Sequence, residues 1–225
     1  MIIDNFEQIK RLMKFEDKDD FYFLQIIQRK KDGCNVYDSG SNGYRRVKTY
    51  YITSIEDLEK RKDKIIELCK SNNARAYIHL NVRSAKEVAL NAAKAYIDLV
   101  REDRCNQGYR IYDHVCGVTP KMGVKKKWIV DVDTKDIDKV KRLCDAICKC
   151  RSAYHWNAVN DTYDNIIDKI PTPHGVHIIT HRFDVGHFKS YLNENLSDIF
   201  TVEEIKEICA VKEDNPTILY FEKND

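Results

Sequence analysis

The sequence lacks long apolar runs and strong net charge, and it contains little proline or glycine. No apolar stretch approaches the roughly 20 residues that a membrane-spanning helix needs. The first residues, Met1–Asn5, have no basic flank followed by an apolar core, so no signal peptide is expected. With 4 prolines and 8 glycines in 225 residues, there is no low-complexity tract either. We therefore expect a cytoplasmic protein that does not contact membranes.

The charges nearly cancel: 38 Lys and Arg side chains face 36 Asp and Glu side chains, for a formal net charge of +2. Any binding of nucleic acid must then rely on local basic patches instead of the field of the whole protein. The length suits one large domain or two small, closely associated ones, with a substantial core.

The 8 cysteines include no pair with the two-residue spacing of a zinc knuckle. Cys144 and Cys148 fall on one stripe of a predicted helix, with Cys150 close by, and we interpret all three as small buried side chains with free thiols. Zinc binding would need a fourth ligand from elsewhere, for which Cys105, His114 and Cys116 are the candidates.

The first half of the chain predicts an α/β module. Helical periodicity is found at 5–14 and 84–100, and Ser54 with Asp57 marks the start of another helix, while β-rich runs at 21–28, 47–53 and 74–82 predict strands. The first two strands form a long hairpin with a basic tip that contains Lys30, Lys31, Arg45, Arg46 and Lys48. Residues 101–127 lose the pattern, and we interpret them as the connection between two modules.

The second half predicts the order β-α-β-β-α-β. The strands are expected at 126–133, 168–172, 176–180 and 217–222, and the helices at 135–150 and 201–210. This order is typical of a split βαβ arrangement with an antiparallel sheet, in which the first and third strands are central neighbours. The fold class is therefore α+β, with an N-terminal α/β module at 1–120 packed on an RRM-like module at 121–225.

Two stretches carry the chemistry. The apolar strand 127–133 ends in Asp131 and Asp133, which project from the same face because residues two apart on a strand do so. Two such carboxylates repel each other unless a cation lies between them, and Mg²⁺ or Mn²⁺ is the usual choice. The second stretch reads strand, Gly175 turn, strand, and it brings His177 to the neighbouring strand.

This Asp-x-Asp strand followed by a helix and a Gly-x-His turn resembles the catalytic core of the archaeo-eukaryotic primase (primase-polymerase) superfamily. The resemblance implies a metal-dependent nucleotidyltransferase that adds nucleotides on a single-stranded template in DNA replication. It implies that Asp131 and Asp133 hold the metal ions, that His177 contacts the phosphates of the nucleoside triphosphate and that Gly175 allows the backbone to approach. Partners such as a helicase or another replication protein are expected. The basic residue Arg182 is a further candidate for phosphate binding.

The chain departs from the family pattern at two points. Gly175 stands two residues before the histidine, where serine is frequent, and the third acidic residue has no clear match, with Asp184 and Asp214 as candidates. Asp133 or Thr134 also suits the N-cap of the following helix, which would be a structural role.

Other functions remain open on these residues. The Asp pair also suits a metal-dependent phosphatase or nuclease, and the stretch from Val130 to Thr134 resembles the first motif of haloacid-dehalogenase-like phosphatases. The tetrapeptide starting at Lys30 matches the Lys-x-Asp-Gly of covalent nucleotidyltransferases, although it lies in a predicted hairpin tip. A non-catalytic RRM-like protein that binds nucleic acid or a nucleotide is the third alternative.

Overall fold

The computed structural model describes residues 1–33, 43–153 and 163–223, which form an α+β protein with two compact units. Unit 1 comprises Met1–Val124 and Pro216–Asp225, and unit 2 comprises Lys125–Asn215. The elements of unit 1 are β1 (Ile2–Asp4), α1 (Phe6–Leu12), β2 (Asp20–Arg29), the 3-10 turn η1 (Lys30–Asp32), β3 (Tyr44–Ile52), α2 (Ile55–Ser71), β4 (Arg75–His79), β5 (Arg83–Ser84), α3 (Ala85–Arg101), the 3-10 turn η2 (Cys105–Arg110), α4 (Ile111–Val118) and β9 (Pro216–Glu222).

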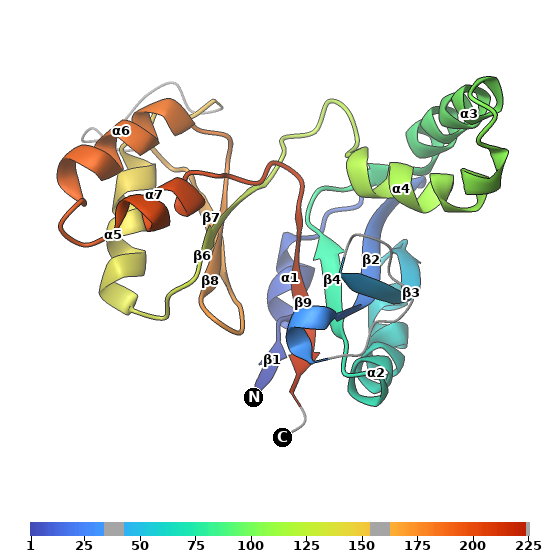
Figure 1. Cartoon of the computed structure of the whole chain (residues 1–225), viewed down its shortest axis with the longest axis horizontal. Helices are drawn as coiled ribbons and strands as arrows, with labels where there is room; N and C mark the ends of the chain where they lie inside the picture. The colour runs from blue at the N-terminus through green and yellow to red at the C-terminus, as the bar shows by residue number, and fades with distance from the viewer. Residues whose placement is uncertain (34–42, 154–162, 224–225) are drawn as a thin grey trace. The chain divides into compact units, whose positions relative to one another are not determined.

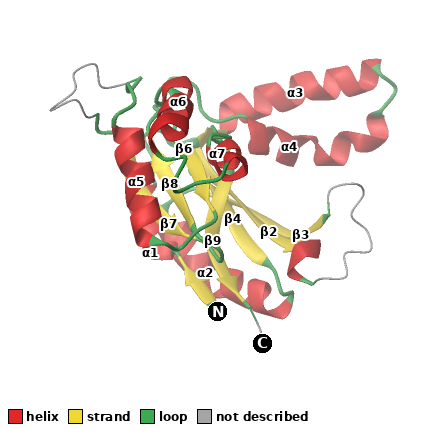
Figure 2. Ribbon diagram, turned by 60° about the vertical axis from the view of Figure 1, so that its left-hand side comes forward, coloured by secondary structure: helices red, strands yellow, loops and turns green. Residues whose placement is uncertain are grey.

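The sheet of unit 1 has the strand order β1-β9-β4-β2-β3, with β5 paired to β2, and every pairing is antiparallel. Figure 2 shows β9, β4, β2 and β3 side by side. Strand β2 alternates as a sheet with two different faces requires: Leu24 and Ile26 are fully buried, whereas Gln25 and Ile27 are half-buried. The predicted strands and helices of this half are confirmed, and Ser54 caps α2 by accepting the Asp57 N–H as expected.

The prediction that 101–127 is only a connection is wrong. This segment contains η2 and α4, and α4 packs Val115 and Cys116 against Phe21 and Phe23 of β2. The helix has only eight residues, and it is stabilised by packing Ile111, Val115 and Cys116, which share its buried side, against β2.

Unit 2 is built on the three-stranded antiparallel sheet β6-β8-β7. Its helices lie on one face of that sheet (Figure 1), where Val130, Val132 and Ile178 of the strands share a core with Leu143 and Phe188 of the helices. The elements are β6 (Trp128–Val132), α5 (Ile137–Cys148), β7 (Ile166–Pro171), β8 (Val176–Thr180), α6 (Val185–Asn195) and α7 (Val202–Ile208).

The pairing of β6 with β8 confirms that the first and third strands of this module are neighbours. The fourth predicted strand, β9, differs from the prediction because it pairs with β4 and β1 in the sheet of unit 1. What remains in its place is one residue, Lys212, whose backbone exchanges two hydrogen bonds of 2.8 Å with Ile129 of β6. Strand β9 itself, Pro216–Glu222, therefore belongs to the sheet of unit 1.

Helix α6 was not predicted from the sequence, and Arg151–Ile167, which the sequence left unplaced, lies partly outside the described residues. Among the described helices, none has both the length and the apolar character needed to cross a bilayer.

Candidate functional site

Asp131 and His177 are directly opposite each other on β6 and β8. The His177 Nε2 atom lies 3.3 Å from Asp131 Oδ1. The imidazole is largely shielded, with 14% of its side chain exposed, whereas Asp131 is 48% exposed. One carboxylate oxygen is therefore held by the histidine, and the group remains accessible to a ligand.

The position of this pair follows from the alternation of β6. Val130 and Val132 are fully buried in the core under the helices, so Asp131 between them projects to the opposite face. On β8, Ile178 faces the same core, and His177 consequently shares the face of Asp131. The alternation of the sequence is sufficient to place both groups.

Asp133 is exposed just beyond the end of β6, and it does not cap α5. The N-cap is Asp136, whose Oδ1 accepts the N–H groups of Asp138 and Lys139 at 2.9 and 3.1 Å. Thr134 accepts the Asp136 N–H, so it supports the turn before the helix. The structural alternative for Asp133, a helix cap, is therefore excluded.

Gly175 is required by a close approach of two backbone segments. A Cβ atom at this position would lie 1.9 Å from Val132 O and 2.6 Å from Thr134 N. Its backbone does not adopt a positive φ, so glycine is needed here for lack of space and not for a left-handed conformation. The residue fits its turn tightly against the end of β6, and Thr172 fixes that turn by accepting the Gly175 N–H at 3.0 Å.

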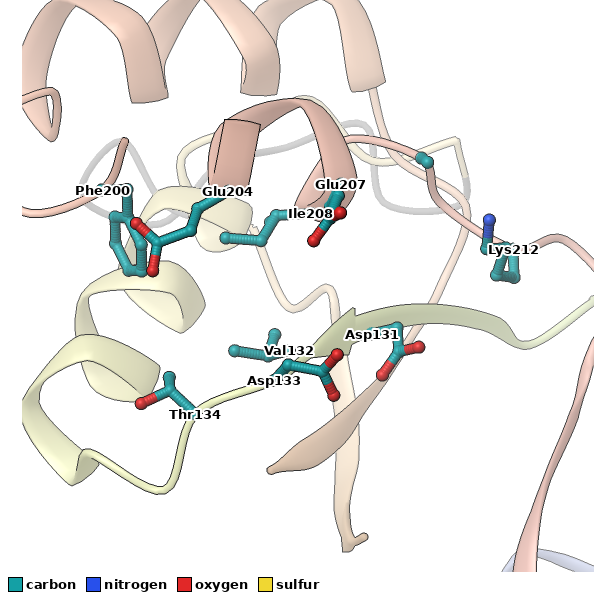
Figure 3. Close-up of a pocket in the computed structure, with 10 residues that line it drawn as sticks. Asp131, Val132, Asp133, Thr134, Phe200, Glu204, Glu207, Ile208 and Lys212 are labelled. Carbon is teal, nitrogen blue, oxygen red and sulfur yellow. The ribbon is translucent and has the colours of Figure 1, made fainter. Parts of the chain in front are cut away.

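A pocket of ≈ 290 Å³ opens beside the end of β6, between that strand and α7 (Figure 3). Phe200 and Ile208 form apolar parts of its wall. Its charged lining consists of four carboxylates and one ammonium group: Asp131, Asp133, Glu204, Glu207 and Lys212. Carboxylate oxygens are the ligands that Mg²⁺ and Mn²⁺ prefer, so the donor set fits a hard divalent cation.

Glu207 is a residue of this pocket that the sequence reasoning missed. Figure 3 shows its carboxylate on α7 turned towards Asp131 and Asp133. Glu204, which lies one turn earlier, is engaged in a capping box with Thr201. The helix itself was predicted at 201–210, but no local pattern indicates that the turn with Glu207 faces the end of β6.

The other predicted site residues lie elsewhere. The Arg182 guanidinium is 5.7 Å from the ring of Trp128, at the end of β6 opposite to the carboxylates, so the structure does not bring Arg182 to the pair. Asp184 caps α6 by accepting the His187 N–H at 2.9 Å. Asp214 lies two residues before β9, and within the described chain neither aspartate lines the pocket.

In the described parts of the chain, only Asp17, Asp19 and Asp20 of unit 1 bring three possible ligand atoms within 4.8 Å of one another. This cluster already has a cation, since Lys121 Nζ lies 2.6 Å from both Asp17 Oδ2 and Asp20 Oδ1. The carboxylates beside β6 are farther apart. Mg²⁺ usually retains several of its waters, and a hydrated ion can span such a distance.

The cysteines of the described chain are free thiols. Burial raises the pKa of Cys116 and of Cys150 to about 12, and it also raises the pKa values of Cys144 and Cys148. Cys150 donates to the Ala146 carbonyl oxygen, as a small helical side chain does. No zinc-type group of cysteine and histidine ligands is present among these residues, within the same 4.8 Å.

Comparison of the chain with protein-family models, curated proteins and solved structures found no match.

Proposed function

We propose that this protein is a metal-dependent nucleotidyltransferase of the primase-polymerase type, with its catalytic site at the end of β6. The single observation that carries the proposal is the Asp131–His177 pair, 3.3 Å apart, which opens on a pocket lined by further carboxylates. The strand order β6-β8-β7, with Lys212 bridging β6 on its other edge, supports an RRM-like scaffold in which that single bridge stands in place of the fourth strand.

In this proposal, Asp131 and Asp133 hold Mg²⁺ or Mn²⁺ and His177 binds a phosphate oxygen of the nucleoside triphosphate. The cation would supply neutralisation of the phosphate charge. In the reaction, the 3′-hydroxyl of the growing strand attacks the α-phosphorus and loses its proton to water, the bond to the β-phosphate oxygen breaks, and pyrophosphate leaves. Strand β8 and the contact with Asp131 hold the His177 ring at the site, and Nε2 would exchange Asp131 for the phosphate oxygen when the nucleotide binds.

The test is nucleotide incorporation on a primed single-stranded template with Mg²⁺ or Mn²⁺, measured as strand extension together with pyrophosphate release. The double variant D131N/D133N should lose at least about a hundredfold in rate, because metal-ion neutralisation contributes several kcal/mol. The matched control is Asp138→Asn, which removes an equally exposed carboxylate from the first turn of α5.

Two outcomes would overturn the proposal. Release of inorganic phosphate or cleavage of the template, abolished by the same double variant, would assign the Asp pair to a phosphatase or nuclease. Absence of any turnover, together with no Mn²⁺ binding by calorimetry, would leave a non-catalytic RRM-like protein.

A further inference from the structure

One face of the sheet in unit 1 is only partly covered. Phe21 and Phe23 of β2 lie under α4 in a shared core. Farther along the same strand and on the same face, Gln25 and Ile27 are half-exposed. The uncovered part of this face therefore lies towards the hairpin end of β2 and β3.

Register identifies the side chains on this face, from the border of the part that α4 covers to the hairpin end, because residues paired across strands share a face. Phe23 pairs with Tyr51, Gln25 with Tyr77, and Arg29 with Tyr44. We name this surface the tyrosine–arginine face and define it by Arg29, Tyr44, Arg46, Tyr51 and Tyr77, since Arg46 pairs with the half-exposed Ile27.

Two rings on this face are accessible, and that of Tyr51 is also held by its neighbours. Tyr44 is 44% exposed and Tyr51 is 37% exposed. The Tyr51 ring packs against Phe21 and Phe23 with centroids 5.7 and 5.9 Å apart, and Tyr112 of α4 meets its edge at 5.6 Å. Fixed, exposed rings provide flat surfaces on which unpaired bases stack at a small entropic cost.

The same end of the hairpin is strongly basic. The described segments 29–33 and 43–48 contain six cationic side chains (Arg29, Lys30, Lys31, Arg45, Arg46 and Lys48) and one carboxylate. That carboxylate, Asp32, is bound by Arg75. One further acid borders the face: Asp113 of α4 accepts hydrogen bonds from Arg46 and from the Tyr51 hydroxyl. The local charge is positive although the whole chain carries only +2.

We propose that the tyrosine–arginine face binds single-stranded nucleic acid, with bases on the tyrosine rings and phosphates at the arginines. The choice of this partner rests on the proposed function, for which the strand would be the template. Duplex nucleic acid fits less well, because its stacked bases cannot reach the rings. An acidic protein segment would pair its carboxylates with the arginines but would not stack on the exposed rings.

The experiment is fluorescence anisotropy of the full chain with a labelled oligothymidylate of about 15 nucleotides, with EDTA present. The variant R29A/R46A should raise the dissociation constant at least about tenfold and lower the slope of log K against log salt by about 1.4, since each lost phosphate contact removes about 0.7. The matched control is K60A/K64A on α2, which packs against the opposite face of the sheet through Arg61 and Tyr50 and should bind as the wild type does.

Two further variants separate binding from folding. Asp113→Asn weakens the hydrogen bond that Asp113 accepts from Arg46, so the affinity for oligothymidylate should rise severalfold. If Arg46 only supported the fold through Asp113, this variant would lose affinity, as R29A/R46A does. Tyr44→Phe should bind as the wild type does, whereas Tyr44→Ala should weaken binding about tenfold because it removes a stacking surface.

Equal binding by R29A/R46A and K60A/K64A would overturn the proposal, as would a duplex of the same sequence bound as tightly as the single strand. If unlabelled polyglutamate competes with the labelled probe for the wild type and unlabelled oligothymidylate does not, the face binds an acidic protein. The variant D131N/D133N should retain binding of oligothymidylate. Binding by the wild type without incorporation would contradict the proposed function alone. Incorporation by the wild type with no effect of R29A/R46A on binding would contradict the role of this face alone.

Discussion

At the scale of single residues, Gly175 has no room for a side chain beside the end of β6. Gly175→Ala would place a methyl group 1.9 Å from Val132 O, so the turn or the end of β6 must move. We expect a loss of about 1–3 kcal/mol in unfolding free energy, as for overpacked cores, and a larger proportional loss of incorporation because Asp131 and Asp133 would shift. Urea denaturation measures the first effect. Gly117→Ala is the control, because its nearest neighbour would be 3.9 Å away, and equal stability of both variants would contradict the prediction.

A second residue-scale prediction concerns Lys121, which joins Asp17 and Asp20. Burial raises the pKa of Asp20, but the bonds from Lys121 and two backbone N–H groups outweigh it, so the pKa is lowered overall. A lowered carboxyl pKa contributes stability above its unfolded value, and that contribution is lost as the pH falls through the folded value. Lys121→Met should therefore cost about 2 kcal/mol at pH 7, and the difference from the wild type should shrink below about pH 4.

The measurement is urea denaturation of both proteins at a series of pH values. Lys18→Met removes an exposed charge nearby and should leave stability unchanged at every pH. A constant difference between Lys121→Met and the wild type across the acid range would contradict the assignment to Asp20.

At the scale of elements, the two aspartates around the start of α5 should behave differently. Asp136→Ala should destabilise the protein by about 1 kcal/mol, because it removes the acceptor for two N–H groups of the first turn. Asp133→Ala should leave stability unchanged or slightly higher, because it removes a carboxylate from an acidic pocket. Thermal unfolding of the two variants tests this, and a larger loss in Asp133→Ala would return Asp133 to a structural role.

The elements also show which parts of the fold and of the site could be predicted from the sequence. Alternation of Val130, Asp131 and Val132 predicted the face of the carboxylate, and the pairing with His177 followed from the strand order. Helix α6 was within reach of the sequence, because Val185, Phe188 and Leu192 recur at helical spacing and pack in the core of unit 2. Glu207 escaped prediction because its importance depends on where α7 packs, and no local pattern contains that information.

At the scale of the molecule, the unforeseen feature is β9, whose residues were correctly predicted as a strand but assigned to the wrong sheet. The apolar sequence of a strand predicts that it is buried in a sheet but not which strands it pairs with, because the partners lie in distant segments of the chain. In unit 1 it lies between β1 and β4, and Leu219 is fully buried.

Leu219→Asp should therefore destabilise unit 1 selectively. Hydrogen exchange should show loss of protection in β1 and β4, with β6 and β8 retained, because a buried unpaired charge acts on the core around it. Val202→Asp, at an exposed position of α7, is the control and should leave both units protected. Equal loss of protection in both units would mean that they unfold as a single body.

The return of the chain to unit 1 also orders events during its synthesis. The other strands of unit 1 leave the ribosome before the whole of unit 2, Lys125–Asn215, and only then does β9 emerge. Until that moment β1 lacks its partner and β4 has an open edge, the kind of edge that recruits strands from other nascent chains. Unit 2, whose three strands are contiguous in the chain, can complete its sheet earlier. The chain can thus form its candidate catalytic sheet while the sheet of unit 1 still lacks one strand.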